Sequence, residues 1–284
     1  MSAVIESSNI KIREITEPAE MRPVEDLQRE VWGVPDLDVV PVTHLVATKE
    51  AGGVLIGAYD GENLVGFVYG FPAFEHGQMA HHSHMLAVKP EYRNFDLGRR
   101  LKLAQREHVI AQGIGLMTWT FDPLQSLNAY FNFCKLGVVS DRYLPNFYGE
   151  DAASFLHQTG TDRLWISWFV NSDRVKNRIS NAAAALDAGS TTPLVEVTND
   201  GSPRRNDLSA SLAYDRTSIE IPGDINSLYE ESAQKAFSWR EDTRWAFTEA
   251  LNAGYVISGF MRGRRDSQML GSYLLSKAEL LSFR

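Results

Sequence analysis

The residues best suited to chemistry in this sequence are two histidines, His82 and His84, in an apolar run that ends at Val88. Because side chains alternate along a strand, both imidazoles would lie on one face, and one could pass a proton to the other. An alkylammonium group has a pKa near 10, so making it neutral at pH 7 costs about 4 to 5 kcal/mol, whereas a histidine can accept that proton through water. The pair could therefore take a proton from such a group.

Less specific interpretations of the histidines remain open. They could be hydrogen-bonded structural residues or, with His76 and His81, a loose zinc site without nearby cysteines. Cys134 is the only cysteine, which excludes an internal disulfide and agrees with a reducing compartment. We interpret Cys134 as a packing residue, with a thiol nucleophile as the alternative.

A second group of chemical features follows directly, at a turn from strand to helix. Its successive N–H groups and the positive end of the helix would point into one space, and this geometry binds phosphate without a metal. Arg93, Arg99 and Arg100 add positive charge around the turn. The alternative is a turn that only redirects the chain.

The elements that must hold these groups follow from the hydrophobic pattern. We expect strands at residues 10–15, 54–59, 64–69, 83–88, 115–121 and 164–170. Helices are expected at residues 18–32, 97–112 and 127–136. The helix 97–112 carries five residues of its expected inner face at helical spacing: Leu97, Leu101, Ala104, His108 and Ala111.

A shift in composition toward small and polar residues predicts a linker. We therefore divide the chain into a domain at 8–180, a linker at 181–218 and a small α+β extension at 219–284. The extension should hold a strand, a long helix and two more strands, at 219–221, 226–252, 255–261 and 269–275. On that helix Arg240 and Arg244 share one face, which is either an exposed charged face or a site for a substrate carboxylate.

Composition limits the classes of function. The 284 residues include 28 Lys and Arg against 36 Asp and Glu, and this net charge of −8 argues against a duplex nucleic-acid binder. A hydrophobic content of 44% argues against disorder, and the apolar runs are far shorter than the ~20 residues of a membrane span. No secretory signal is visible at the start. We expect a cytoplasmic protein without a nucleic-acid or membrane partner, and a homodimer stays open.

The turn resembles the acyl-CoA-binding loop of the GNAT superfamily, the acyl-CoA-dependent N-acyltransferases. The family pattern, Arg/Gln-x-x-Gly-x-Gly/Ala, falls on residues 93–98, where Arg93 and Gly98 match and Asp96 replaces the middle glycine. Asp tolerates a positive φ, but its charge would repel a pyrophosphate by ~1 to 4 kcal/mol unless it points away. The resemblance spans residues 8–150 and implies an α/β (α+β) GNAT fold with a mixed, mainly antiparallel sheet.

The resemblance also implies the site residues, with acyl-CoA (acetyl-CoA or succinyl-CoA) as co-substrate and no metal. The residues expected to bind it are Leu86, Ala87, Val88, Arg93, Asn94, Phe95, Asp96, Leu97, Gly98 and Arg99. The run from His82 to Val88 is similar to the arylalkylamine N-acetyltransferase branch, whose paired histidines serve in proton removal. Phe133 stands where many members have an acidic tyrosine, so Tyr130, or else Tyr143 or Tyr148, would have to protonate the thiolate, with packing as the alternative for each.

The function that we predict is transfer of an acetyl or other short acyl group, with succinyl as one option, to the amine of a small molecule or amino acid. The C-terminal tail resembles that of a bacterial GNAT-like group, some of whose relatives are associated with N-acylation of amino acids. The alternative is a non-catalytic GNAT-like module that binds acyl-CoA or another ligand as a sensor or interaction subunit. A third option is a GNAT-like fold without CoA affinity, used for protein contacts.

Overall fold

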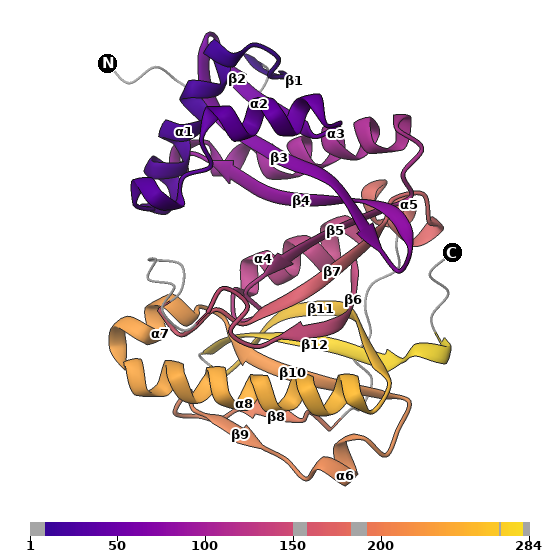
Figure 1. Cartoon of the computed structure of the whole chain (residues 1–284). Helices are drawn as coiled ribbons and strands as arrows, with labels where there is room; N and C mark the ends of the chain where they lie inside the picture. The colour runs from indigo at the N-terminus through magenta and orange to yellow at the C-terminus, as the bar shows by residue number, and fades with distance from the viewer. Residues whose placement is uncertain (1–8, 150–157, 183–191, 267, 281–284) are drawn as a thin grey trace. The chain divides into compact units, whose positions relative to one another are not determined.

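The computed structural model describes residues 9–149, 158–182, 192–266 and 268–280 (Figure 1). The chain divides into two compact units, which we call the N-terminal unit, up to Trp119, and the C-terminal unit, from Thr120 on. Three parts of the predicted boundaries lie outside the described residues: the domain start at 8, the part of the linker at 183–191 and the end of the extension at 281–284.

The N-terminal unit is a sheet with helices. Its elements are β1 (Ile10–Glu14), α1 (Pro18–Trp32), α2 (Val42–Glu50), β2 (Val54–Asp60), β3 (Asn63–Glu75), β4 (Gln78–Val88), the 3₁₀ turn η3 (Pro90–Phe95), α3 (Leu97–Ala111) and β5 (Leu116–Phe121), whose end belongs to the C-terminal unit. The strand order is β1-β2-β3-β4-β5. Neighbours from β1 to β4 are antiparallel, and β4 pairs with β5 in parallel.

Helix α1 shows how the sequence builds this core. Met21, Val24 and Leu27 recur at spacings of three and four, and all three are buried in a cluster with side chains of the sheet, including Phe67 and Tyr69. The helix ends at Gly33 in the left-handed conformation, with φ of 61°. Its bounds agree with the sequence prediction.

Several elements, including a helix and a strand of the domain expected at 8–180, were absent from the prediction. In α2 only Leu45 is buried, so the helix has almost no apolar periodicity to detect. In β6 (Val139–Leu144) two buried residues are followed by partly exposed polar ones, which also leaves a weak pattern.

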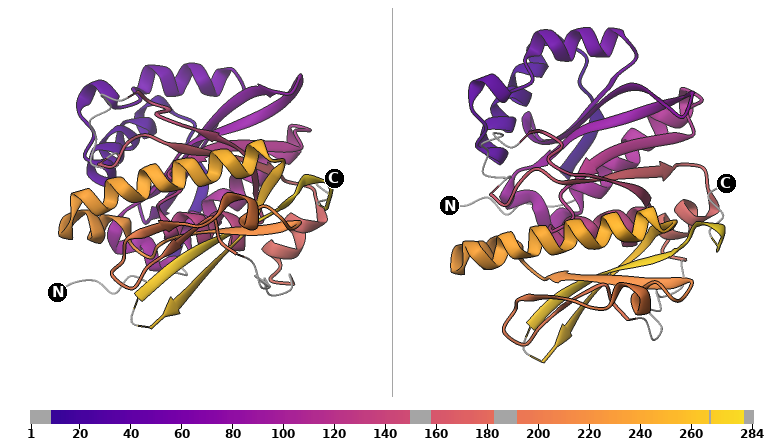
Figure 2. Two further views of the ribbon diagram at one scale, coloured as in Figure 1. Left: turned by 90° about the horizontal axis from the view of Figure 1, so that it is seen from below. Right: turned by 60° about the horizontal axis from the view of Figure 1, so that its bottom comes forward.

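The C-terminal unit holds the remaining strands and helices. Its elements are α4 (Ser126–Tyr130), the π-helical η4 (Phe131–Leu136), β6, β7 (Arg163–Phe169), α5 (Asp173–Ile179), β8 (Val195–Val197), β9 (Pro203–Arg205), α6 (Leu208–Ser211), β10 (Arg216–Pro222), α7 (Ile225–Glu231), α8 (Ala233–Asn252), β11 (Tyr255–Arg265) and β12 (Gln268–Lys277). The strand order is β7-β6-β11-β12-β10. Figure 2 shows α8 running along one face of the strands β10 to β12.

An aromatic cluster forms the core of this unit. The ring of Tyr273 lies 4.7 Å from that of Phe260, 5.1 Å from Phe247 and 5.8 Å from Phe133, measured between centroids. The segment expected to be a linker contributes to the same unit, since its described part forms β8, β9 and α6 and buries Leu194. Its small polar residues lie between these short elements, which is why composition alone indicated a linker.

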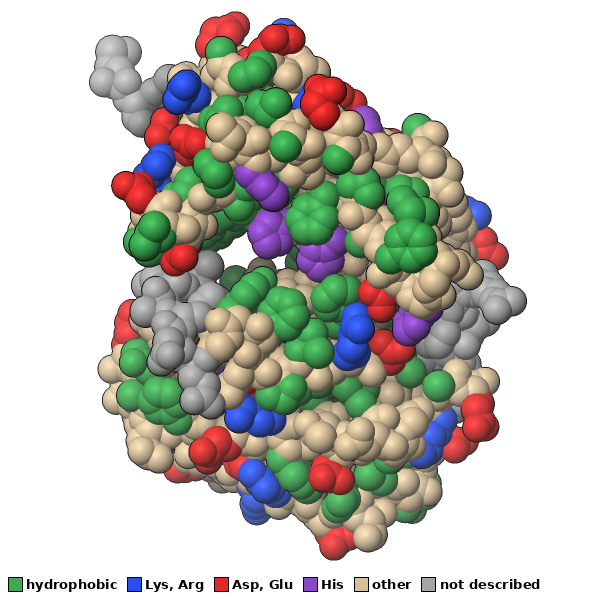
Figure 3. All heavy atoms as spheres, viewed as in Figure 1, with side chains coloured by type: hydrophobic (Ala, Val, Ile, Leu, Met, Phe, Trp, Pro, Cys, Tyr) green, Lys and Arg blue, Asp and Glu red, His purple; other side chains and the backbone are tan. Residues whose placement is uncertain are grey.

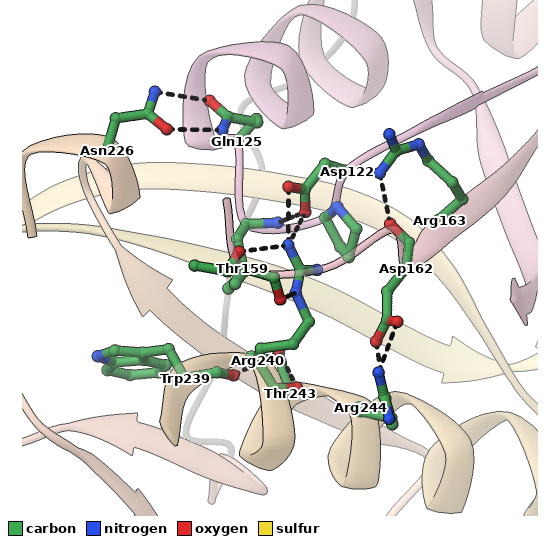
Figure 4. Close-up of polar contacts among 12 residues, drawn as sticks. Asp122, Gln125, Thr159, Asp162, Arg163, Asn226, Trp239, Arg240, Thr243 and Arg244 are labelled. Carbon is green, nitrogen blue, oxygen red and sulfur yellow. Dashed lines mark hydrogen bonds and ion pairs between the residues drawn. The ribbon is translucent and has the colours of Figure 1, made fainter. Parts of the chain in front are cut away.

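Two arginines of α8 hold the helix to the rest of the C-terminal unit (Figure 4). Arg240 is 3% exposed and donates from one terminal nitrogen to both carboxylate oxygens of Asp122, each at 2.8 Å. Burial lowers the pKa of Arg240, but Asp122 raises it by more. Arg244 makes a two-point contact with Asp162, with both distances at 2.8 Å. Both sequence interpretations of Arg240 are therefore wrong, because its partner is the chain's own carboxylate.

We expect Arg240→Ala to lower the free energy of unfolding by about 3 to 5 kcal/mol, because Asp122 would keep a buried charge without its partner. The matched control is Arg205→Ala. Arg205 pairs with Asp242 at 2.7 Å but is 46% exposed, so its loss should cost less than about 1 kcal/mol. Urea denaturation of the three proteins measures both changes, and equal losses in the two variants would contradict this assignment.

Candidate functional site

The strands β4 and β5 stay together over only a short stretch. Their parallel pairing consists of His81 with Met117 and His82 with Thr118. On the other side β4 stays paired with β3 as far as Val88. Within the described residues, the edge of β4 that faces β5 therefore has no strand partner from Ser83 on, and its alternate N–H and C=O groups are available to a ligand.

A β-bulge lies at the point where β4 leaves β5. Tyr69 on β3 pairs with Met85 and the next residue, Gly70, pairs with Ser83, so His84 is the extra residue. Before the bulge, His81 and Ser83 contact Gln105 of α3, whereas after it Leu86 lies beside the start of α3, at Gly98. The bulge thus changes which side chains face α3, and an alternating pattern in the sequence cannot reveal it.

His82 and His84 do lie on one face of β4, as the sequence predicted. Their ring centroids are 6.3 Å apart, and Phe71 lies 5.5 Å from His82 and 5.6 Å from His84. The Nδ1 atom of His82 is 3.0 Å from the hydroxyl oxygen of Thr118. Figure 3 shows histidine side chains gathered among hydrophobic ones on the surface of the N-terminal unit.

Both histidines are poor proton acceptors compared with a free imidazole. Burial, and secondarily the neighbouring His84 and Lys102, lower the pKa of His82 to about 4. The pKa of His84 is also lowered, by the surrounding protein and by His44, although the residue is exposed. Both side chains are therefore neutral at pH 7 and able to accept a proton.

On the opposite face of β4, a buried chain of hydrogen-bonded polar side chains links the strand to α3. Lys102 is 4% exposed, donates to the Ser83 hydroxyl at 2.7 Å and lies 3.8 Å from the centre of the Trp119 ring. Ser83 in turn donates to Gln105, which lies 3.1 Å from Nε2 of His81. Burial lowers the pKa of Lys102 to about 7.

This buried chain also explains a glycine. A Cβ on Gly70 would come within 2.4 Å of His81 Nε2 and 2.8 Å of Gln105 Nε2, so only glycine leaves room for their hydrogen bond. The sequence prediction missed the chain because it placed Ala104, His108 and Ala111 on the inner face of α3. Lys102, Gln105 and Val109 are buried there instead, and Ala111 is exposed. Their spacing of three and four could have indicated this face, but two of the three are polar.

The turn after β4 has the backbone expected of the family loop. Asp96 has φ of 54° and ψ of 23°, which is the left-handed region where Asp is among the less costly residues. Its carboxylate is largely exposed and lies 3.4 Å from Arg99 Nη1. Arg100 donates instead to the carbonyl of Ile10 at 2.7 Å, so this side chain binds the first residue of β1. Arg93 and Asn94 are exposed.

Phe133, which stands where the resemblance implies a proton-donating tyrosine, and the tyrosines that could replace that donor have different surroundings. Phe133 is fully buried in the aromatic cluster. The Tyr143 hydroxyl donates to Asp162 at 2.5 Å, and burial and that carboxylate raise its pKa. Tyr130 lines a pocket of the C-terminal unit together with Cys134. The Cys134 thiol donates to the Phe260 carbonyl, and burial raises its pKa.

The described residues hold neither a metal-binding group of side chains nor a membrane-spanning helix. No three His, Cys, Asp or Glu side chains in this part of the chain are grouped so that they could hold a metal ion. Among the described helices, none has the length and apolar character needed to cross a membrane.

Comparison with known proteins identifies the family of the N-terminal part. Residues 12–133 match the model of the acetyltransferase (GNAT) family. This part of the chain is a GNAT domain, and the predicted fold class, an α/β GNAT fold with a mixed sheet and a C-terminal extension, is confirmed. None of the curated protein sequences matches the chain.

Solved structures with some similarity cover 57% of this chain. They include aminoglycoside 6'-acetyltransferase type Ii (22% identity, TM-score 0.46, 98% of that chain) and the ribosomal-protein-S18-alanine N-acetyltransferase of Escherichia coli (11%, 0.45, 95%). A third is a GNAT family acetyltransferase from Elizabethkingia anophelis with acetyl-CoA bound (16%, 0.41, 98%).

The pKa of Lys102 gives a pH-dependent expectation. Between about pH 7 and pH 10.5 the folded state holds fewer protons on Lys102 than the unfolded state, so its burial destabilises the fold less as the pH rises. Relative to Lys102→Met, the wild type should therefore gain stability across this range in chemical denaturation. Lys11→Met, at an exposed position of β1, is the control and should run parallel to the wild type. A constant difference between wild type and Lys102→Met would contradict the assignment.

Proposed function

We propose that this chain is an N-acyltransferase that moves an acetyl or other short acyl group, with succinyl as one option, from acyl-CoA to the amine of a small molecule or amino acid. The observation that carries the proposal is the open edge of β4 after His82, which leads through a left-handed turn into the start of α3. The family match over residues 12–133 supports the same function.

Main-chain groups at both ends of this segment suit acyl-CoA. Along Leu86, Ala87 and Val88, the unpaired edge can bind the pantetheine amides as an added strand would. At the turn, the amides of Leu97 and Gly98 have no acceptor inside the helix and can donate to the diphosphate.

The side chains of the turn also suit a diphosphate. Arg93 and Arg99 supply positive charge, and Asn94 and Phe95 complete the turn. Asp96 does not oppose binding with an unpaired charge, because its carboxylate pairs with Arg99 and is largely exposed. The repulsion that its replacement of glycine suggested is thereby reduced.

The reaction requires an uncharged amine. Its nitrogen attacks the thioester carbonyl, and an N–H of the open edge of β4 can stabilise the oxyanion. In this tetrahedral intermediate the nitrogen carries one proton too many, and the C–S bond breaks as the thiolate of CoA leaves once that proton is removed. His82 accepts it on Nε2 in the tautomer whose Nδ1–H donates to Thr118, and His84 can relay it to solvent.

The low pKa of His82 determines at which step of the reaction this residue can accept the proton. A histidine with a pKa of about 4 cannot readily deprotonate an alkylammonium whose pKa is near 10. After attack the same nitrogen is far more acidic, because it is bonded to the tetrahedral carbon. We therefore assign His82 to proton removal from the intermediate rather than from the free substrate.

A non-catalytic module that binds acyl-CoA is the second candidate. The observation in its favour is Phe133, which fills the position of the family's usual proton donor and is packed between Phe121 and Tyr273. Tyr130 is the remaining phenol that we propose as donor, and it is partly exposed. Binding without turnover in the assays below would favour the module.

Binding can be tested at the turn. We expect CoA to raise the melting temperature of the wild type, and Arg99→Gln to weaken CoA binding about tenfold through loss of a charge-assisted contact. Arg100→Gln is the matched control, because Arg100 is committed to Ile10 and its loss should lower stability without changing affinity. Calorimetric titration with CoA separates the two effects. No binding of millimolar CoA to the wild type would refute the proposal.

Turnover can be tested through the histidines. With an amino acid or amine found by screening thiol release from acetyl-CoA and succinyl-CoA, His82→Ala/His84→Ala should lower kcat by about 10² to 10⁴. His76→Ala, whose side chain is 82% exposed at the β3–β4 turn, should leave kcat unchanged.

The pH dependence of the wild type separates this role from that of an ordinary histidine base. Because His82 is already neutral well below pH 6, the pH–rate profile should show no inflection near 6.5 and should follow only the ionisation of the amine. Full activity of the double variant at every pH would remove the histidines from the mechanism.

A further inference from the structure

A cavity lies wholly within the C-terminal unit. It has a volume of about 350 Å³, within the range of small-molecule sites. Its walls come from α4 and η4, from the end of α5 and its following residues, and from β11. The lining residues are Tyr130, Cys134, Lys135, Arg178, Asn181, Phe260, Met261 and Arg262.

The charge of this cavity is opposite to that of the protein. Three of its lining side chains are cations, Lys135, Arg178 and Arg262, and none is a carboxylate, although the whole chain has a net charge of −8. Within the described part of the chain, none of these three cations forms an ion pair with Asp or Glu. The cavity therefore concentrates positive charge that no carboxylate among the described residues neutralises through an ion pair.

A further cation behind the wall strengthens this imbalance. The Nε of Arg174 donates to the Gly137 carbonyl at 2.9 Å, so neutral oxygens hold the guanidinium. Burial, together with the nearby Arg178, lowers the pKa of Arg174 to about 10. An anion in the cavity would offset the mutual repulsion of these cations.

The cavity is also shaped before any ligand binds. A Cβ on Gly137 would come within 2.9 Å of Arg178 Cγ, so the stem of Arg178 is held against the backbone at the end of η4. Tyr130, Phe260 and Met261 supply aromatic and apolar surface between the cations. This combination suits a ligand with a flat apolar part next to its charges.

We propose that this cavity binds a small molecule that carries a dianionic phosphate, or two carboxylates, on an aromatic or similarly flat group. The lining lies on other elements than the β4 edge and the turn proposed for acyl-CoA, and only Tyr130, proposed above as proton donor, belongs to both proposals. Binding in this cavity does not depend on the acyltransferase function. The binding energy comes from the three cations, and the apolar wall selects the part of the ligand that carries the charge.

The only cysteine of the chain reports whether the cavity is occupied. Cys134 lines it, so a bound ligand should slow alkylation of this thiol by neutral iodoacetamide, followed by mass spectrometry. Phenyl phosphate and phthalate are the two probes, and protection by one or both identifies phosphate or dicarboxylate as the recognised group. Benzamide is the neutral control and should not protect.

Variants assign the protection to the cations. In Lys135→Gln/Arg178→Gln/Arg262→Gln, protection by either dianion should disappear. Lys176→Gln should retain it, because Lys176 lies on α5 but pairs with Asp173 and does not line the cavity. Arg93→Gln/Arg99→Gln should also retain it, which separates this site from the turn before α3. Protection by benzamide, protection that survives the triple variant, or no protection by either dianion at millimolar concentration would each overturn the proposal.

A measurement on the unmodified protein guards against misfolding of the triple variant. Relative to a small free thiol, Cys134 should react about tenfold faster with an anionic methanethiosulfonate than with a cationic one of similar size, because the cations concentrate the anionic reagent. Added salt should reduce this ratio. A ratio near one would overturn the proposal whatever the variants show.

Discussion

The parting of β4 from β5 is the constraint on which the proposed active site depends. Two parallel pairs, at His81 and His82, fix the strands together, and the bulge at His84 follows at once. A straight continuation of the pairing would satisfy the β4 edge with β5 and leave nothing for an acyl-CoA amide. Because β3 holds one side of β4 while the other edge stays open, this segment is fixed in place and its main-chain N–H and C=O groups on the open edge can still bind a ligand. A preorganised binding strand requires both properties.

The two faces of β4 carry different groups of side chains. One face carries His82 and His84, which lie beside Phe71 of β3 and which we propose as proton acceptors. The other buries Lys102, Ser83 and Gln105 between β4, α3 and Trp119. A lysine in that position is costly, since burial disfavours its charge, but its contacts to Ser83 and the Trp119 ring tie strand to helix beside the opening. The buried chain thus positions the strand whose free edge the proposed ligand uses.

Much of this architecture follows from local patterns, and the rest depends on distant contacts. The bounds of α1, the β2–β3 hairpin and the shared face of His82 and His84 could be predicted because spacing alone determines them. The bulge, the buried Lys102 and the pairing of Arg240 with Asp122 could not, because each depends on a partner far away in the sequence. The left-handed Asp96 lies between these cases, since the family loop pattern indicated the conformation but not the pairing of its carboxylate with Arg99.

The phenyl ring of Phe133, at the position where the sequence resemblance implies a proton-donating tyrosine, does not by itself decide between enzyme and binding module. A tyrosine there would carry its hydroxyl into the buried aromatic cluster around Phe121 and Tyr273, which costs free energy unless the hydroxyl is hydrogen-bonded. A thiol with a pKa near 8.5 is nevertheless a good leaving group, and its thiolate can take a proton from water at neutral pH. General acid catalysis contributes roughly 10² to 10⁴, so its absence would slow the reaction without preventing it. Removal of the proton from the nitrogen after attack is therefore the step that the β4 histidines would have to assist if the chain is an enzyme.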